Sequence, residues 1–139
     1  MSYKIIGKYI KKINFGINNP KTFFLLSKNI ANYKINIDIK SNQIKERIIE
    51  VETSLNLLPI KEGFEKIETK IIYSVIVELE INLTDKTEIE KIILVKVPTQ
   101  IYPELRRIFI FIFENSGFKD VNINKTVDFQ ELYNKRKVQ

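Results

Sequence analysis

Two glutamates, Glu50 and Glu52, are the residues of this sequence whose spacing most resembles a catalytic pair of carboxylates. The 139 residues contain no histidine and no cysteine, which removes imidazole catalysis, thiolate nucleophiles, disulfides and the usual zinc sites. Glu50 and Glu52 alternate with apolar neighbours, and this alternation places them together on one face of a strand. We therefore expect a solvated strand face here and no active site.

The remaining residues show no catalytic or metal-binding pattern. The sequence has no glycine-rich phosphate loop and no serine in a nucleophile elbow. No aspartate belongs to a nucleophile or metal motif; the aspartates are Asp38, Asp85, Asp120 and Asp128. We predict that the protein is not an enzyme and that it has no catalytic residue, no metal site and no cofactor.

The basic charge needs an explanation, because a basic chain can be a nucleic-acid-binding protein. The formal net charge is +6, and residues 1–40 hold eight lysines against one acid, Asp38. However, 19 of the 23 basic residues are lysine, which lacks the planar, bidentate donors that arginine offers to base edges. The abundance of Ile, Lys and Asn is also what an AT-rich coding sequence would produce. A basic nucleic-acid-binding module is therefore kept as an alternative, not as the main interpretation.

Length and hydropathy predict one domain spanning residues 1–139. The longest apolar run, Ile108–Phe113, has six residues, far fewer than the roughly 20 that a membrane helix needs. The N-terminus carries scattered lysines and no apolar block that ends in small residues, unlike a secretory signal. We expect a cytoplasmic protein without membrane insertion.

Four segments have the pattern of antiparallel strands. The clearest is Tyr33–Lys40, in which apolar and polar residues alternate throughout. Ser41-Asn42 then has the chemistry of a turn. Glycine, asparagine and proline separate the segments, at Gly16–Pro20 and at Pro59–Gly63. The other three predicted strands are an edge strand at Ile5–Phe15, a strand at Ile49–Leu57 and a long strand at Ile67–Leu79.

Helices are predicted after the strands. One begins near Thr87, a candidate cap, and should stop near Val97 because Pro98 disfavours helical geometry in the residue before it. The next runs from Pro103 to a stop at Gly117. A short last helix begins at Asp128, a good cap, and runs to about Lys135. Strands followed by helices give the α+β class, with a four-stranded antiparallel sheet, a long apolar helix and a short C-terminal helix.

Excess apolar surface predicts an oligomer. The strand Ile67–Leu79 carries Ile72 and Ile76 on the face opposite its main apolar row, and the long helix carries Ile110 and Phe111 outside its apolar stripe. A small chain cannot cover such an element on all sides by itself. The residues predicted to meet a partner subunit are Ile72, Ile76, Ile108, Ile110, Phe111 and Phe113.

A series of short motifs in the last third of the chain resembles one protein family. The series comprises Pro98, Ile101-Tyr102-Pro103, Arg106, Gly117-Phe118, Val127-Asp128-Phe129 and Leu132-Tyr133. Its order and spacing resemble the C-terminal half of SecB, the export chaperone that holds unfolded preproteins for the SecA translocation motor. The resemblance implies the fold class given above and a homotetramer, built as a dimer of dimers with the long helices between the sheets.

The resemblance also implies a function and a site. The expected function is that of an ATP-independent holdase, which binds unfolded preproteins along an apolar groove and passes them to SecA. Many small apolar contacts and exposed strand edges suit such clients, because they demand little sequence specificity. The groove is expected between the sheet and the last helix with its preceding loop. The residues expected to line it are Ile35, Ile37, Phe129, Leu132 and Tyr133.

The N-terminal half departs from the family at the expected SecA-docking positions. Tyr9–Pro20 resembles the family's first strand, but two positions that are acidic in the family are Lys12 and Gly16 here. A third acidic contact corresponds to Glu68. The three residues are the candidate SecA contacts, and the two replacements motivate an alternative: a SecB-like chaperone dedicated to one partner, such as an antitoxin.

Overall fold

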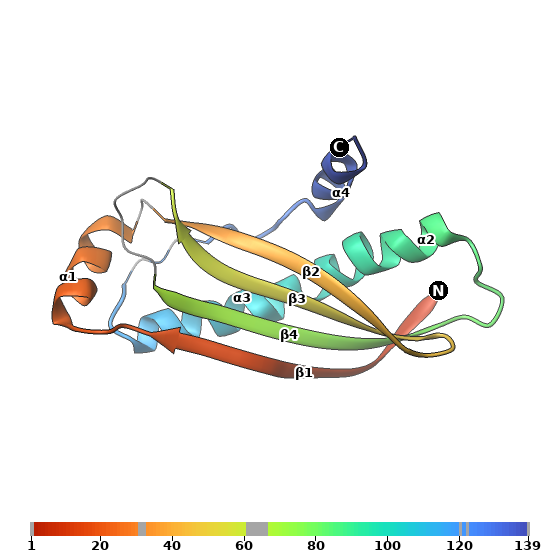
Figure 1. The fold of residues 1–139 in the computed structure, drawn as a ribbon, viewed down its shortest axis with the longest axis horizontal. Helices are drawn as coiled ribbons and strands as arrows, with labels where there is room; N and C mark the ends of the chain where they lie inside the picture. The colour runs from red at the N-terminus through yellow and green to blue at the C-terminus, as the bar shows by residue number, and fades with distance from the viewer. Residues whose placement is uncertain (1, 31–32, 61–66, 120, 122, 139) are drawn as a thin grey trace.

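A four-stranded antiparallel sheet forms one layer of the molecule, and a helical run covers one of its faces (Figure 1). The computed structural model describes residues 2–30, 33–60, 67–119, 121 and 123–138. The strand order is β1-β4-β3-β2, with all neighbours antiparallel. The strands are β1 Tyr3–Gly16, β2 Tyr33–Lys45, β3 Ile48–Pro59 and β4 Glu68–Leu79. The predicted α+β class and the edge position of β1 are confirmed.

The helices follow the sheet, with one exception. Helix α1, Pro20–Asn29, lies between β1 and β2 and was not predicted. The side chain of Asn19 accepts a hydrogen bond from the backbone N–H of Thr22 at 2.9 Å, and Pro20 occupies the first turn. The Asn-Pro step that follows the end of β1 therefore begins a helix. The remaining helices are α2 Lys86–Lys91, the π-helix η2 Ile92–Lys96, α3 Val97–Asn115 and α4 Phe129–Val138.

The hairpin between β2 and β3 turns later than the sequence predicted. β2 continues through Ser41 and Asn42, which pair with Val51 and Glu50, and the turn lies at Glu46 and Arg47. The Asn42 amide does not form a turn; it donates to the Glu52 carboxylate at 2.9 Å. Arg47 takes the left-handed conformation that closes the turn, with φ of 66°. The prediction of a turn at Ser41-Asn42 was wrong because cross-strand partners were available.

Helical structure also continues past the predicted stop at Val97. The N–H of Val97 donates to the carbonyl of Ile92, five residues earlier, so the chain passes through a π-type turn. Pro98 then lies in the first turn of α3, where its missing N–H is tolerated. Pro103, predicted to begin the helix, lies inside it. The C-terminal stop is confirmed: α3 ends at Asn115 and Gly117 has φ of 93°.

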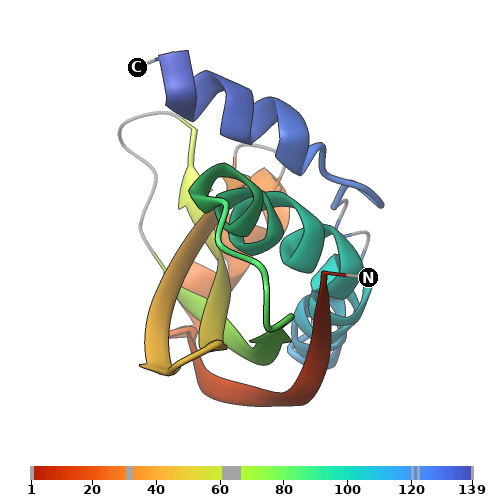
Figure 2. The same cartoon turned by 90° about the vertical axis from the view of Figure 1, so that its right-hand side faces the viewer.

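The core lies between α3 and the sheet face that it covers, here called the inner face. Five α3 residues spaced four apart are at most 1% exposed: Val97, Ile101, Leu105, Phe109 and Phe113. They pack with inner-face residues of the two central strands, Val51, Leu55, Ile71, Val75 and Val77. Figure 2 shows the sheet curving around the helical run, with β1 on one side and β2 on the other.

A polar contact ties β1 and β4 to α3 at the side of this core. The Glu104 carboxylate accepts hydrogen bonds from Lys8 at 2.8 Å and from the Tyr73 hydroxyl at 2.7 Å. These two bonds hold the pKa of Glu104 below its ordinary value. Burial, together with the bond to Glu104, raises the pKa of Tyr73 to about 12. Tyr73 therefore remains a hydrogen-bond donor throughout the physiological pH range.

The opposite, outer face of the sheet holds a buried carboxylate, that of Glu50. It accepts from Ser74 of β4 at 2.6 Å, Tyr9 of β1 at 2.5 Å, Lys11 of β1 at 3.3 Å and Asn42 of β2 at 3.4 Å. Glu50 itself is on β3, so these bonds connect all four strands. The sequence had suggested a solvated side chain at this position, but the residue is only 7% exposed. Alternation gave the correct face, but it could not show that neighbouring strands cover that face.

Hydrogen bonding to the ionised form makes Glu50 a source of pH-dependent stability. Bonds from Ser74 and Tyr9 lower the pKa of Glu50 from 4.5 to about 2. A group whose pKa is lower in the folded state stabilises the fold above its unfolded-state pKa, and this contribution is lost as the pH falls toward the folded-state value. For Glu50 the loss is expected between pH 4.5 and about 2.

We predict that Glu50→Gln lowers the free energy of unfolding at neutral pH and that its difference from wild type shrinks by more than half at acid pH. Urea titrations of both proteins at about pH 7 and about pH 3 measure this difference. Glu114→Gln, at an exposed position near the end of α3, is the matched control and should differ little from wild type at either pH. A deficit of Glu50→Gln that stays constant with pH would contradict the assignment.

Candidate functional site

Two cavities follow one another along β2, at the edge of the sheet opposite β1. The first, here called the apolar cavity, has a volume of about 460 Å³. Its walls come from β2, from Leu57 of β3, from Tyr102 of α3 and from the segment between α3 and α4. The residues that line it are Ile30, Tyr33, Lys34, Ile35, Ile37, Leu57, Tyr102, Val121, Ile123, Asn124 and Val127.

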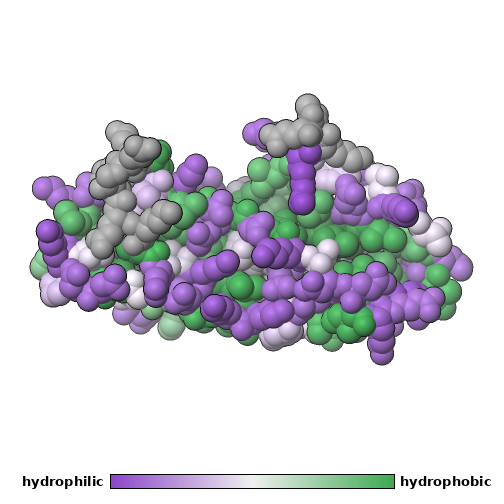
Figure 3. Space-filling view, viewed as in Figure 1, coloured by the Kyte–Doolittle hydropathy of each residue, from purple (hydrophilic) through white to green (hydrophobic). Residues whose placement is uncertain are grey.

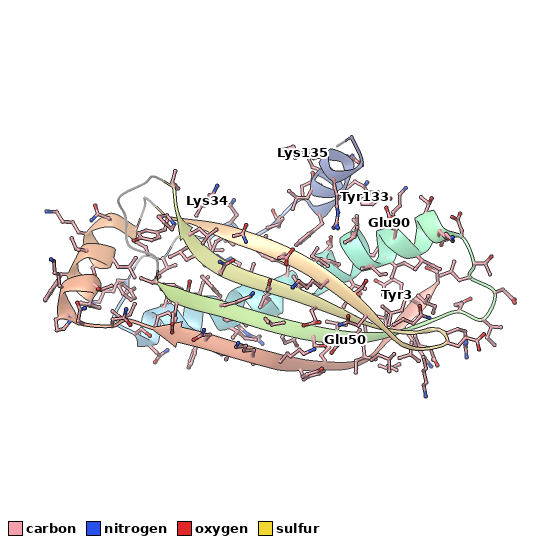
Figure 4. The ribbon with its side chains drawn as sticks, in the orientation of Figure 1. Tyr3, Lys34, Glu50, Glu90, Tyr133 and Lys135 are labelled. Carbon is pink, nitrogen blue, oxygen red and sulfur yellow. The ribbon has the colours of Figure 1, made fainter. Side chains whose placement is uncertain are left out.

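The second, here called the mixed cavity, lies farther along β2 and has a volume of about 570 Å³. Its lining combines apolar and charged side chains: Ile39, Lys40, Ser41, Asn42, Glu90, Ile93, Leu94, Tyr133 and Arg136. Figure 4 shows Tyr133 on α4 and Glu90 on α2, and both residues line this cavity. Figure 3 shows hydrophobic surface between α4 and the sheet, with polar side chains around it. Together the two cavities form what we call the β2 groove.

Two α3 side chains hold the outer wall of the groove in place. Arg106 donates to the carbonyl of Ile123 through Nε at 3.1 Å and Nη2 at 3.0 Å, and the Tyr102 hydroxyl donates to the carbonyl of Asn124 at 2.8 Å. We call this arrangement the Arg106–Tyr102 clamp. Burial raises the pKa of Tyr102, so its hydroxyl stays protonated and able to donate. The clamp satisfies backbone carbonyls in a segment whose described residues, 121 and 123–128, form neither helix nor strand.

Helix α4 closes the groove from above and is fixed at its first turn. Phe129 is 1% exposed, and its ring lies edge-on to Tyr102 with the centroids 6.0 Å apart. Asp128 accepts from the N–H of Glu131 at 2.9 Å, which confirms the predicted cap. Helix α4 lies against η2, and its residues Tyr133 and Arg136 line the mixed cavity.

The structure brings only some of the predicted groove residues together. Ile35 and Ile37 line the apolar cavity, and Tyr133 lines the mixed cavity. Phe129 is buried beneath the start of α4, so it supports the wall without lining it. Leu132 is 45% exposed and lines neither cavity. Client contact by any of these residues stays a prediction.

The three candidate SecA contacts lie on the outer face, in the β1–β4 ladder and away from the groove. Lys12 pairs with Ile72 in the β1–β4 ladder, and Gly16 pairs with Glu68 at the end of the same ladder. A side chain added at Gly16 would meet the Glu68 carboxylate at 3.5 Å. Gly16 and Glu68 are therefore neighbours, and Lys12 lies four positions from Gly16 along β1. SecA binding by these residues stays a prediction.

The predicted interface residues fall into three groups. Phe113 is fully buried within the chain, in contact with Phe15, Phe109 and Phe118, so a second copy could not reach its side chain. Phe111 is 64% exposed and suits an interface. The other four are half-buried: Ile108 and Ile110 on α3, and Ile72 and Ile76 on the outer face of β4.

Sequence reasoning missed most of the groove lining. Tyr102 and Arg106 belong to the motif series but were not assigned to the site, and Ile30, Val121 and Ile123 were not singled out at all. The available signals were the fixed spacing of Tyr102 and Arg106 on one helix face and the alternation of Val121 and Ile123. Neither pattern tells which distant carbonyl or strand edge the side chain meets.

Other kinds of site are not apparent in the part of the chain that the structure describes. Within residues 2–30, 33–60, 67–119, 121 and 123–138, no group of three or more acidic side chains is placed to hold a metal ion. None of the helices in those ranges is both long and apolar enough to cross a membrane.

Comparisons with known proteins agree on one family. The chain matches the family described as preprotein translocase subunit SecB over residues 1–139. A Pelagibacter ubique protein with a provisional assignment as protein-export protein SecB is 41% identical over 135 residues, which cover 97% of this chain and 96% of that protein. The protein-export protein SecB of Rhodospirillum rubrum is 28% identical over 138 residues, covering 95% of this chain and 80% of the relative.

A solved structure shows the same fold at low identity. It is a Mycobacterium tuberculosis SecB-like chaperone in complex with a ChAD peptide from the HigA1 antitoxin. The TM-score is 0.63 at 10% identity, with 88% of this chain and 90% of that chain covered. The family match over the full length and the identity to the Pelagibacter protein together show that this chain belongs to the SecB family of protein-export chaperones.

Proposed function

We propose that this protein is an ATP-independent cytoplasmic holdase that binds unfolded preproteins in the β2 groove. The observation that supports this most is the groove itself: two cavities in succession along a free sheet edge, walled by apolar side chains from four parts of the chain. An unfolded client offers apolar side chains and unpaired backbone groups. The groove can accept both along one extended path.

The groove suits clients of varied sequence. Its apolar cavity is lined mainly by isoleucine, valine, leucine and tyrosine, which contact apolar groups without fixed geometry. Affinity in such a site grows with the apolar area removed from water, so several weak contacts along a long segment add up. This mode of binding needs no nucleotide and no bond chemistry, in keeping with a family of chaperones and not of enzymes.

We further propose that the protein acts as a homotetramer, a dimer of dimers, and passes its clients to SecA. The exposed Phe111 and half-buried Ile108 and Ile110 give α3 an apolar surface on the side away from its own core. SecA is proposed to dock on the outer face, where Lys12, Gly16 and Glu68 lie. The lysine and the glycine there would change the charge that the motor meets.

A second candidate function is service to one dedicated partner. The Mycobacterium tuberculosis chaperone with the same fold was solved with a peptide from an antitoxin. A chain of this architecture can therefore hold one particular peptide. A dedicated chaperone would bind that partner and ignore unrelated unfolded precursors.

Native mass spectrometry of the purified protein, with and without an unfolded secretory precursor, tests the main proposal. We expect a tetramer that gains one precursor chain, and we expect no complex with the same precursor in its folded form. A tetramer that ignores several unrelated unfolded precursors would favour the dedicated-partner function instead. A monomer that binds none of them would overturn the holdase proposal.

The tetramer is tested separately at Phe111. Replacement by glutamate puts a charge on the apolar surface of α3, so Phe111→Glu should convert tetramers to dimers in sedimentation velocity experiments. Ile81→Glu is the control: Ile81 is 75% exposed in the segment after β4, and its variant should keep the wild-type mass. An unchanged tetramer of Phe111→Glu would place the interface elsewhere.

Arg106 and its neighbour Arg107 provide a matched test of the groove. Arg106→Ala removes two hydrogen bonds to the Ile123 carbonyl, so the segment between α3 and α4 should gain amide hydrogen exchange. Affinity for an unfolded client should fall about tenfold, as expected for loss of charged hydrogen bonds that order a wall. Arg107 is exposed and makes no such bond among the described residues. Its alanine variant should therefore match wild type in both measurements. Equal losses in the two variants would show that the clamp does not contribute to client binding.

A further inference from the structure

The charged residues that line the β2 groove are mostly basic. Lys34 lines the apolar cavity and is the only charged residue in its lining. Lys40 and Arg136 line the mixed cavity, together with one acid, Glu90. Three cations and one anion therefore lie beside the apolar and uncharged polar residues of the lining. A client with acidic side chains would find more attraction there than a client with basic ones.

Two other described acids lie near these cations on the sheet. Asp38 lies between the two lysines on β2, and Glu52 of β3 is the cross-strand partner of Lys40. Neither acid lines a cavity, and Glu52 is held by Lys11 at 3.4 Å and by Asn42 at 2.9 Å. None of Lys34, Lys40 and Arg136 forms an ion pair with a described acid.

The acids of α4 are also engaged. Asp128 accepts from the N–H of Glu131 at the helix start. Glu131 is 3.4 Å from Lys135, one turn along the same helix. The cations of the groove are therefore available to a ligand.

The spacing of the cations sets a length for the ligand. Lys34 and Lys40 are six positions apart on β2, which corresponds to about 20 Å of extended chain. Arg136 reaches the same cavity as Lys40 from α4. An extended segment along the groove would therefore meet a cation at each end, with about six residues between them over the apolar lining.

We infer that the β2 groove selects extended apolar segments that carry acidic residues at their ends, and that Lys34, Lys40 and Arg136 determine this preference. The inference rests on the proposed function, because it concerns what the same groove selects.

Three peptides with one apolar core and different ends test the selection. The core has about six residues, to match the spacing of the lysines, and the ends are aspartate, lysine or glutamine. Fluorescence anisotropy with the full-length protein gives each affinity. We expect the acidic peptide to bind about tenfold more tightly than the basic one at low salt, with the neutral peptide between them. The difference should shrink as salt is added.

Charge reversal assigns the preference to the groove. Lys40→Glu combined with Arg136→Glu should make the basic peptide the tighter binder and leave the neutral peptide unchanged. The matched control is Lys21→Glu combined with Lys70→Glu, at exposed positions of α1 and β4 that line neither cavity. The control should keep the wild-type order of affinities.

The outcomes separate this inference from the proposed function. If the neutral peptide binds but the charged peptides bind equally, or the basic one binds more tightly, the selection by charge is overturned while the holdase proposal stands. If the control reverses the order as well, the preference comes from net charge and the assignment to the groove is wrong. If no peptide binds, the client groove itself is overturned, and the inference with it.

Discussion

The β2 groove depends on three hydrogen bonds from α3 to two backbone carbonyls. Arg106 and Tyr102 fix Ile123 and Asn124 in a segment that forms neither helix nor strand. Without these donors the two carbonyls would form hydrogen bonds with water instead, and the segment would no longer be held along the sheet edge. The position of α4 follows from the same clamp, because Phe129 packs against the ring of Tyr102. One row of α3 side chains thus fills the core, and Tyr102 and Arg106 of the same helix hold the wall of the groove.

Apolar surface is the second constraint on this chain. The inner face of the sheet and one side of α3 satisfy each other almost completely, since Val51, Leu55 and Phe113 are fully buried. Among the described residues, the apolar surface left over includes the side of α3 that carries Phe111 and the edge of the sheet at β2. A chaperone needs both, because one surface can assemble copies and the other can hold a client. Burying either within the chain would give a more stable monomer with less function.

Local patterns predicted the elements better than they predicted the site. Alternation identified the strands, and the caps at Asp128 and Gly117 were read correctly from residue type. Local patterns gave wrong predictions where the structure of a residue depends on a partner in another element. Asn42 has turn chemistry, yet its amide bonds to Glu52 across the ladder. Ile30, Val121 and Ile123 line the groove together only because the tertiary fold brings them close. No local sequence pattern could predict that contact.

The distribution of charge over the folded chain indicates the kind of ligand better than the net charge does. A net charge of +6 suggested a nucleic-acid partner, but the folded chain separates its charges by surface. On the outer face, Lys11 lies within 3.4 Å of both Glu50 and Glu52, and Lys4 lies 3.3 Å from Glu78. Lys4 and Lys11 are therefore paired with acids, whereas none of Lys34, Lys40 and Arg136 in the β2 groove forms an ion pair with a described acid. A phosphate backbone needs a continuous basic surface, while an extended peptide needs only a few cations beside apolar pockets. The charge distribution therefore favours a peptide ligand.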